Sequence, residues 1–397
     1  MKYRVPYGGA LIDSAEKKAI MKVVNRNWWP ADKEAATMEC EAATYLGVKY
    51  GILANSGSSA GLLALTALEL PKGSKVAIPA VTFPTIFNII LQCNLIPVVL
   101  DVEVGTYNLD VNALEDALKK NDIKAVICVH AVGNPCDMRR IMQLSSKHKF
   151  YVLEDNCDGW GGNIGNKKVG SFGHISFTSF HAAHIVAMGQ GGGIFTNGKE
   201  LARKVRMYRD WGRQSDIPRR TNGNKWLSLP KDQDARFIYE KIGYNLGPLE
   251  LQAAMGRVQL KKTEKIKRLR RKNYEYLIKE LAQFDDIILP HTVEDADPSW
   301  FALPLSVKGK RAPLVALLEK RGIETRSMFS GNILRHPAYA HLKFDEKSLP
   351  TADWILEHSF WIGVHPRMTK KDREYVVNVF KEYYSQEKWG THNYLWE

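Results

Sequence analysis

Between residues 50 and 180 the chain alternates short apolar runs with segments of helical periodicity, and this alternation restricts the fold more than any other feature. Near-continuous apolar strands separated by helices are typical of a parallel sheet that is covered on both faces. The sequence therefore predicts an α/β fold with a mostly parallel central sheet flanked by helices. The runs expected as strands are residues 50–55, 75–79, 97–102, 125–130, 150–155 and 175–180, with a further strand at 193–196.

A polar or aromatic residue stands at or just beyond the end of several predicted strands. Ligands of open α/β sheets bind beyond the carboxyl ends of the parallel strands. We therefore expect these residues to converge on one site. They are Ser56, Phe83, His130, Asp155 and Ser179.

The stretch that begins at the end of the 175–180 run combines a hydroxyl, two imidazoles and a glycine cluster. It reads SFHAAH over residues 179–184 and continues to three glycines at 191–193. Glycines at a strand end allow the backbone to approach a ligand closely. The nearest lysines are Lys168 and Lys199, so the stretch itself offers no amine.

A turn of small residues, Ser56-Gly57-Ser58, precedes a helical segment that begins near Leu62. Backbone N–H groups at the start of a helix favour phosphate, because they lie at the positive end of the helix dipole. The same residues also form an ordinary helix cap. The turn by itself leaves both interpretations open.

Several motifs in a fixed order resemble those of the DegT-type sugar aminotransferase family of fold-type I pyridoxal phosphate (PLP) enzymes. The family's Schiff-base lysine falls on the position of His184. One branch of the family makes this replacement, the nucleotide-sugar 3-dehydratases, which hold pyridoxamine phosphate (PMP) without a covalent bond. The motifs are NSGSSAGLLAL from Asn55, VTFPT from Val81, VLEDNCDGWGG from Val152, SFHAAHIVAMGQGGGIFTN from Ser179 and GYNLGPLEL from Gly243.

The resemblance implies roles for residues that would bind the cofactor. Gly57 and Ser58 would donate backbone N–H groups to the cofactor phosphate, and Ser179 would add its hydroxyl. Phe83 would stack on the pyridine ring. Asp155 would pair with the protonated ring nitrogen, which keeps the ring able to accept electrons. Out of this context a phenylalanine is more often a core residue, and an aspartate at a strand end more often forms a turn.

The resemblance also implies a catalytic role for His184. An imidazole exchanges protons near neutral pH but does not form a stable imine with the cofactor aldehyde. The PMP amine is then left to react with the 4-keto group of a nucleotide-linked 4-keto-6-deoxyhexose, while His184 moves a proton and the C3 hydroxyl leaves. Asp158, which the resemblance also places among the cofactor-binding residues, stands where the aminotransferases usually carry Gln and the 3-dehydratases carry Asp.

Residues of the C-terminal half are implied in contacts with a partner subunit or with the sugar nucleotide. Asn245 matches the asparagine that reaches the phosphate of a neighbouring subunit, which implies a homodimer with shared sites. Arg326 and Arg335 match residues around the sugar-nucleotide end of the substrate, although such arginines also form surface ion pairs. Gly247 replaces a basic residue and His336 replaces Gln, so the contacts at these positions depart from the family's pattern.

The cysteines bear on the choice between two dehydratase subtypes. One subtype carries a [2Fe–2S] cluster whose cysteines lie in the loop after DWGR, which is residues 210–213 here. No cysteine follows Cys157, so the four thiolates of a cluster are not available in that loop. We expect no iron–sulfur cluster and no other metal site. We expect the second subtype, which hydrolyses the eliminated product and regenerates PMP from PLP with L-glutamate.

Length and composition limit the remaining possibilities. A chain of 397 residues favours two domains, and we expect a large cofactor-binding domain over 1–262 and a small α+β domain over 263–397. No apolar run reaches the roughly 18 residues of a membrane helix, and the N-terminus lacks the apolar core of a signal peptide, so we expect a cytoplasmic protein without a membrane partner. The net charge of +13 comes without a nucleic-acid-binding motif. It favours a pocket for an anionic substrate over nucleic-acid binding.

Two other functions stay open from the sequence. An ordinary nucleotide-sugar aminotransferase would need a lysine supplied from elsewhere in the fold. A non-catalytic sugar-nucleotide binder would be compatible with the loss of the lysine, but the retention of Phe83, Asp155 and Ser179 favours a working cofactor.

Overall fold

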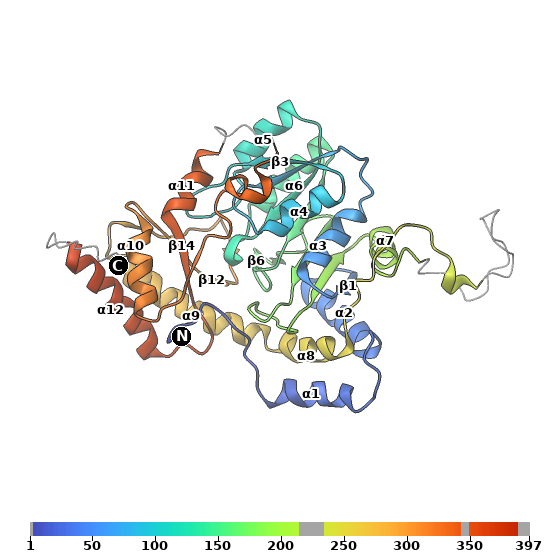
Figure 1. Ribbon diagram of the computed structural model, residues 1–397, viewed down its shortest axis with the longest axis horizontal. Coiled ribbons are helices and arrows are strands. Elements are labelled where there is room, and N and C mark those ends of the chain that lie inside the picture. Colours follow the sequence, from blue (N-terminus) through green and yellow to red (C-terminus); the bar gives the residue numbers. More distant parts are fainter. Residues whose placement is uncertain (1–2, 214–233, 343–348, 388–397) are drawn as a thin grey trace.

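The computed structural model describes residues 3–213, 234–342 and 349–387, and a seven-stranded sheet lies at its centre (Figure 1). The strand order is β1-β9-β8-β5-β4-β2-β3. Neighbouring strands from β8 to β3 pair in parallel, as predicted, whereas β9 runs antiparallel to both β8 and β1. Strand β9 reverses because residues 180–191 form turns instead of the crossover helix that a parallel connection needs. The strands are β1 (Tyr50–Ala54), β2 (Lys75–Pro79), β3 (Ile96–Leu100), β4 (Ile123–Val129), β5 (Tyr151–Asp155), β8 (Ile175–Ser179) and β9 (Gly192–Thr196).

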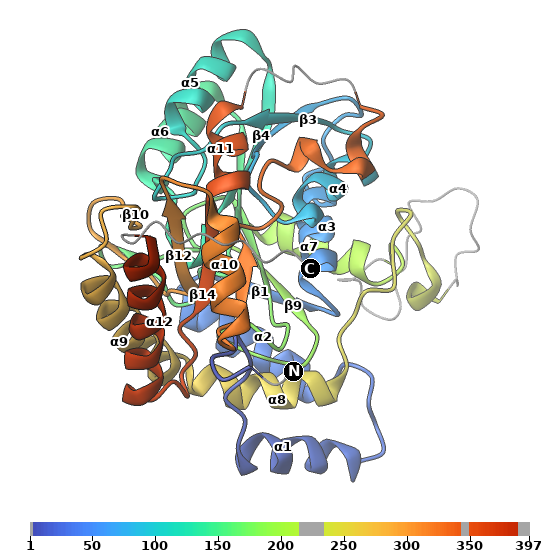
Figure 2. The same cartoon turned by 60° about the vertical axis from the view of Figure 1, so that its left-hand side comes forward.

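Helices cover both faces of this sheet (Figure 2). Successive residues of β1 point to opposite faces of the sheet, as the two-residue period of a strand requires. Ile52 belongs to the hydrophobic cluster on one face and Leu53 to the cluster on the other. One face packs against α3 (Gly57–Thr66), α4 (Pro84–Gln92) and α7 (Lys199–Arg209); the other packs against α2 (Lys33–Leu46), α5 (Val111–Lys120), α6 (Met138–His148) and α8 (Glu250–Lys261).

A second, four-stranded antiparallel sheet forms the core of the C-terminal part, with the order β10-β12-β14-β13. Val5 belongs to this core and forms a bridge with Ile323, so the N-terminal segment packs on the C-terminal part. Its strands are β10 (Ile287–Ile288), β12 (Ala302–Val307), β13 (Thr325–Ser327) and β14 (Ser359–Gly363), and the helices packed on it are α9 (Thr263–Leu281), α10 (Arg311–Lys320) and α12 (Lys370–Glu387).

Helix α8 ends and α9 begins on either side of Lys262. The predicted boundary between residues 1–262 and 263–397 therefore falls at a junction of two helices, and the division into two domains stays a prediction. Figure 1 shows α9, α10 and α12 gathered beside β12 and β14, away from α3 and α7.

The remaining elements are short or peripheral. Helices α4 and α7 were not expected from the sequence; α4 is largely apolar, and α7 is rich in charged residues. No helix in the described ranges is both long and apolar enough to cross a lipid bilayer. The elements not yet named are α1 (Ser14–Val24), α11 (Pro350–His358), the small sheet of β6 (Asn163–Ile164), β7 (Lys167–Lys168) and β11 (Ala296–Asp297), and the 3₁₀ turns Ala131–Gly133, Ala235–Phe237, Ile333–Arg335 and Pro337–Tyr339.

The carboxylate of Glu250 caps a helix that is distant in the sequence. It accepts the backbone N–H groups of Asp32, Glu34 and Ala35 at 2.6, 2.9 and 2.9 Å, and the side chain is buried. These amides lie at the start of α2, where the side chain of Asp32 forms no capping hydrogen bond of its own. The contact fixes the start of α8, and with it the segment that carries Asn245, against α2.

Replacing Glu250 by Gln is expected to lower the free energy of unfolding by about 2–4 kcal/mol, because a charged acceptor of three N–H groups is lost and an amide NH₂ would face them. Denaturant unfolding followed by circular dichroism measures the change. Glu275→Gln, at an exposed position of α9, is the matched control, with an expected change below about 0.5 kcal/mol. Equal stabilities of the two variants would contradict the capping role.

Candidate active site

The structure brings the predicted phosphate-binding residues together at one edge of the sheet. Helix α3 begins at Gly57, directly after β1, and Ser179 is the last residue of β8. A Cβ atom placed on Gly57 would lie 2.5 Å from the Cβ of Ser179, so a residue larger than glycine would collide there. The hydroxyl oxygens of Ser58 and Thr85 lie 2.7 Å apart, which joins this turn to the segment that carries Phe83.

The first N–H groups of α3 remain available to a ligand. Ser56 Oγ accepts the N–H of Ser59 at 3.1 Å, which accounts for one of the amides at this helix end. Within the described ranges, the N–H groups of Gly57 and Ser58 donate to no protein acceptor, as expected for the first turn of a helix. Two free amides beside a serine hydroxyl fit a phosphate group.

Asp155 lies at the end of β5, one strand away from Ser179. Its Oδ1 accepts the backbone N–H of Cys157 at 3.0 Å, and only 6% of the residue is exposed. Burial raises the pKa of Asp155 to about 6, and the nearby charge of Asp158 acts in the same direction. A cation beside this carboxylate would stabilise its charged form, so the position fits a protonated ring nitrogen.

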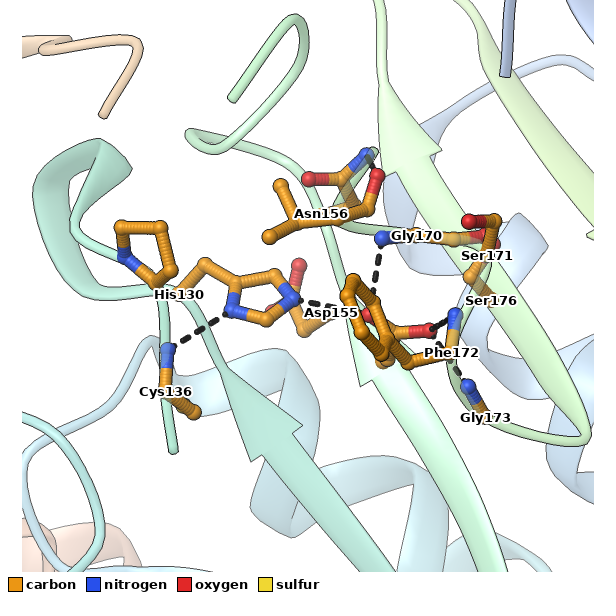
Figure 3. A network of polar contacts seen from close by, with 12 residues as sticks. His130, Cys136, Asp155, Asn156, Gly170, Ser171, Phe172, Gly173 and Ser176 are labelled. Atoms are coloured by element: carbon orange, nitrogen blue, oxygen red, sulfur yellow. Dashed lines mark hydrogen bonds and ion pairs between the residues drawn. The ribbon is translucent and has the colours of Figure 1, made fainter. Parts of the chain in front are cut away.

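The preceding residue, Glu154, is buried and forms polar contacts with His130, Gly170, Phe172 and Gly173, which Figure 3 shows. Its oxygens accept the N–H groups of Gly170, Phe172 and Gly173 at 2.7, 2.7 and 2.6 Å. Nε2 of His130 lies 3.1 Å from Glu154 Oε2, and Nδ1 of His130 accepts the N–H of Cys136 at 3.1 Å. Nε2 therefore carries the hydrogen that Glu154 accepts. His130 does stand at a strand end, but both of its ring nitrogens are used in this network.

His184 lies beside Asp158 in the turns that follow β8. Its Nδ1 is 3.3 Å from Asp158 Oδ1, close enough for an ion pair but not aligned for a hydrogen bond, and Nδ1 has no hydrogen-bond partner among the described residues. The two side chains are 15% and 9% exposed. The imidazole also contacts the ring of Phe301, with 5.4 Å between the ring centroids. With the carboxylate on the Nδ1 side, Nε2 is left for a reacting group.

Phe83 presents an unusually open ring. It precedes the first residue of α4, and 59% of its surface is exposed. The segment around Ser330 lies against this loop, since the Ser330 hydroxyl donates to Thr82 O at 2.6 Å. An exposed aromatic ring next to the α3 turn fits the predicted role of stacking on a planar ligand.

The two predicted substrate-binding arginines both have protein partners. Arg326 donates to Glu324 and lies over the ring of Tyr7, with 4.4 Å between Cζ and the ring centroid. Arg335 forms two hydrogen bonds with Asp353, at 2.9 and 2.6 Å. Their roles in substrate binding stay predictions.

The remaining predicted positions lie on the surface or outside the described ranges. Asn245 is exposed, and the next residue accepts the N–H of Asn55 at 2.9 Å, beside the α3 turn. A Cβ atom on Gly247 would meet nothing within 4 Å, and His336 Nε2 lies 2.7 Å from Ser330 O. The loop after DWGR continues into residues 214–233, which lie outside the described ranges.

Two residues next to His184 are absent from the sequence predictions, Phe301 and Arg270. Arg270 lies in α9, a helix rich in lysine and arginine, and the composition of this helix indicates an exposed face. The helical spacing carried the missed signal, because Ile266, Arg270, Asn273 and Leu277 recur every three or four residues and are all buried.

Comparisons with known proteins show the family to which the chain is similar. The model of the DegT/DnrJ/EryC1/StrS aminotransferase family matches residues 10–381. The chain is 34% identical to the lipopolysaccharide biosynthesis protein RfbH of Salmonella typhimurium, over 96% of this chain and 92% of the relative. It is also 34% identical to dTDP-4-dehydro-2,6-dideoxy-D-glucose 3-dehydratase of Saccharopolyspora spinosa, over 94% of this chain and 85% of the relative.

Among solved structures, E. coli GDP-4-keto-6-deoxy-D-mannose-3-dehydratase with bound hydrated PLP matches with a TM-score of 0.88 and 27% identity, over 96% of this chain and all of that one. The predicted fold-type I architecture and the PLP-type cofactor are confirmed.

Replacing Asp155 by Asn is expected to stabilise the cofactor-free protein at high pH. Because burial raises the Asp155 pKa from 3.8 to about 6, its ionised form opposes folding above about pH 6, and this penalty fades as the pH falls toward 4. The variant should gain about 1–3 kcal/mol of unfolding free energy at pH 8, with a smaller gain at pH 5.

Denaturant unfolding at the two pH values measures this difference, with Asp285→Asn at an exposed position as the control. A gain that is equal at both pH values would contradict the raised pKa of Asp155. PLP titration of the same variant should show weaker binding, because the predicted partner of the ring nitrogen is lost.

Proposed function

Because the chain belongs to the DegT/DnrJ/EryC1/StrS aminotransferase family, we propose that it removes the C3 hydroxyl of a nucleotide-linked 4-keto-6-deoxyhexose, with PMP as the active cofactor and L-glutamate as the donor that regenerates it. The observation that carries this proposal is His184, which stands where the sequence motif places the lysine of an aminotransferase. The names of two relatives, 3-dehydratases acting on dTDP- and GDP-linked deoxysugars, support the same reaction.

The residues of the site suit a cofactor that is held without a covalent bond. When bound, PMP supplies an amine for the substrate ketone and a ring that accepts electrons. Gly57, Ser58 and Ser179 would bind its phosphate, Asp155 would keep its ring nitrogen protonated, and Phe83 would cover one face of the ring.

His184 would transfer the proton of the reaction. Its Nε2 would take the proton from the methylene carbon of the cofactor and pass it to the C3 hydroxyl of the sugar. That hydroxyl leaves as water when the C3–O bond breaks. The carboxylate of Asp158, 3.3 Å from Nδ1, stabilises the imidazolium that exists between these two transfers. The same ring thus serves first as base and then as acid.

Sugar aminotransfer is the second candidate, supported by the description of the family. It needs a lysine that reaches the cofactor. Lys267 is buried, but its ammonium donates to Gly161 O at 2.7 Å and to Asp297 at 2.8 Å. Lys168 lies over the ring of Tyr45. Incubation with PLP, glutamate and a panel of nucleotide-linked 4-keto-6-deoxysugars separates the candidates, because dehydration removes one oxygen without adding nitrogen.

We also propose that the protein acts as a homodimer in which Asn245 reaches the partner's phosphate. Large apolar side chains lie exposed near Asn245. Trp211 is 48% exposed, and its backbone N–H donates to Tyr244 O at 2.6 Å. Trp29 and Leu249 are 49% and 48% exposed, and their segments are joined by a bridge between Pro30 and Leu249. Exposed apolar residues gathered in this way are typical of an interface.

Leu249→Asp is expected to weaken the homodimer about 100-fold, because a charge would be buried at the interface. Sedimentation velocity at micromolar concentration should then show monomers where the unchanged protein shows dimers. Ile96→Asp serves as control, because Ile96 is equally exposed at 48% but lies on β3, at the opposite edge of the sheet from β1. Dimers of unchanged affinity in Leu249→Asp would exclude this surface.

His184→Asn is expected to lower the dehydration rate by about 10²–10⁴-fold, because the proton-transferring group is lost. PLP binding, followed by absorbance, should change little. His181→Asn is the matched control: this neighbouring imidazole is exposed, and its ring lies 6.3 Å from that of His184. Dehydration at the unchanged rate in His184→Asn would refute the assigned role.

A further inference from the structure

Arg270 of α9 is a buried arginine that forms no hydrogen bond with a carboxylate in the part of the chain that the structure describes. It is 1% exposed, and its guanidinium donates to two backbone oxygens, those of Phe301 and Ala183, the latter at 3.4 Å. Its Nε has no hydrogen-bond partner among the described residues. Burial lowers the pKa of Arg270 to about 10, and the charge of Asp158 opposes this change. A buried charge is costly unless its partners compensate it, so its position calls for an explanation.

The surroundings of Arg270 are also those of His184. Ala183 directly precedes His184 in the chain. The ring of Phe301 lies 5.4 Å from the His184 ring and 5.5 Å from the guanidinium carbon. Asp158, whose charge acts on Arg270, lies 3.3 Å from His184 Nδ1. Arg270 therefore touches or attracts three separate neighbours of the imidazole.

The segment that carries His184 consists of turns whose apolar residues are buried, Ile185, Val186 and Met188 among them. Its own backbone hydrogen bonds are short-range: the N–H of His184 donates to His181 O at 3.0 Å, that of Ala182 to Gly189 O at 3.1 Å and that of Met188 to Phe180 O at 2.7 Å. The N–H of Ala183 donates to His181 Nδ1 at 3.3 Å. Phe301 is held by its backbone N–H, which donates to Val132 O at 2.9 Å. Arg270 thus joins the turn that contains Ala183 to the residue that precedes β12.

We propose that Arg270 is a positioning residue for His184: by holding the carbonyl groups of Ala183 and Phe301 and balancing the charge of Asp158, it keeps the imidazole in place for proton transfer. A planar guanidinium suits this role because its fork of donors reaches two acceptors at once, which a lysine ammonium does less well. The kinetic consequence rests on the proposed dehydration, whereas the placement of residues 181–184 does not.

The test compares Arg270→Met, Arg270→Lys and a control, Arg257→Met. Arg257 of α8 is partly buried, and its partners are Glu34 and Glu41, which lie on α2. Steady-state dehydration gives kcat and KM, and absorbance gives PLP affinity. Hydrogen–deuterium exchange of the peptide that contains residues 181–184, in the cofactor-free protein, reports the placement of the segment without any activity.

We expect Arg270→Met to lower kcat about 100-fold, the size of effect that a displacement near 1 Å produces, with KM and PLP affinity within about threefold. Amides 181–184 should exchange at least about tenfold faster. Arg270→Lys should fall between Arg270→Met and the unchanged protein in both measurements, and Arg257→Met should change neither.

Unchanged exchange in Arg270→Met, or equal losses in Arg270→Met and Arg257→Met, would overturn the proposal. If Arg270→Met does not fold, wild-type values of both kcat and exchange in Arg270→Lys would overturn it, and intermediate values would support it. If the unchanged protein dehydrates none of the sugars, the proposed function fails, and the exchange measurement still decides the role of Arg270.

Discussion

A carboxylate buried away from solvent needs donors close by, and Glu154 finds them in three backbone N–H groups and the ring of His130. These contacts fix the end of β4, the end of β5 and the turn around Gly170 relative to one another. Asp155, the next residue, points to the other side of the strand, where it accepts the backbone N–H of Cys157. Of two adjacent buried carboxylates, one is therefore balanced within the protein, while the other remains available to a cation.

Two segments of the site lie beside this framework, the turn at the start of α3 and the turns that carry His184. The α3 turn is rigid and tightly packed, because Gly57 and Ser179 leave no room for a larger side chain between them. In the turns that carry His184, the surroundings of the imidazole come from distant elements, Asp158 after β5, Phe301 before β12 and Arg270 on α9. A group that must both take and release a proton gains from such support, since its orientation has to be maintained in two charge states.

Much of the fold was predictable because the signals are local. The predicted strands agree with the observed ones to within one or two residues at most ends, and the polar residues at their ends do gather at one edge. The reversal of β9 was not foreseen, since strand direction depends on whether residues 180–191 form a helix or turns. Helix α4 was not foreseen either, although Thr85, Asn88 and Gln92 recur at helical spacing and mark its polar side. His130 was expected to join the site because it stands at a strand end, but its side chain is buried and bonded to Glu154 and Cys136. Position at a strand end does not by itself decide whether a side chain faces the site or the core.

The sequence by itself determined which chemical groups the site contains: an imidazole at position 184 instead of an amine, carboxylates at 155 and 158, and a glycine turn before a helix. Chain order and short motifs are enough for that, because each is read within a few residues. Only the tertiary structure decided which groups are close enough to act on one another. The pairing of His184 with Asp158 and the burial of Arg270 between Phe301 and Ala183 join elements far apart in the chain, and no local pattern specifies such distances.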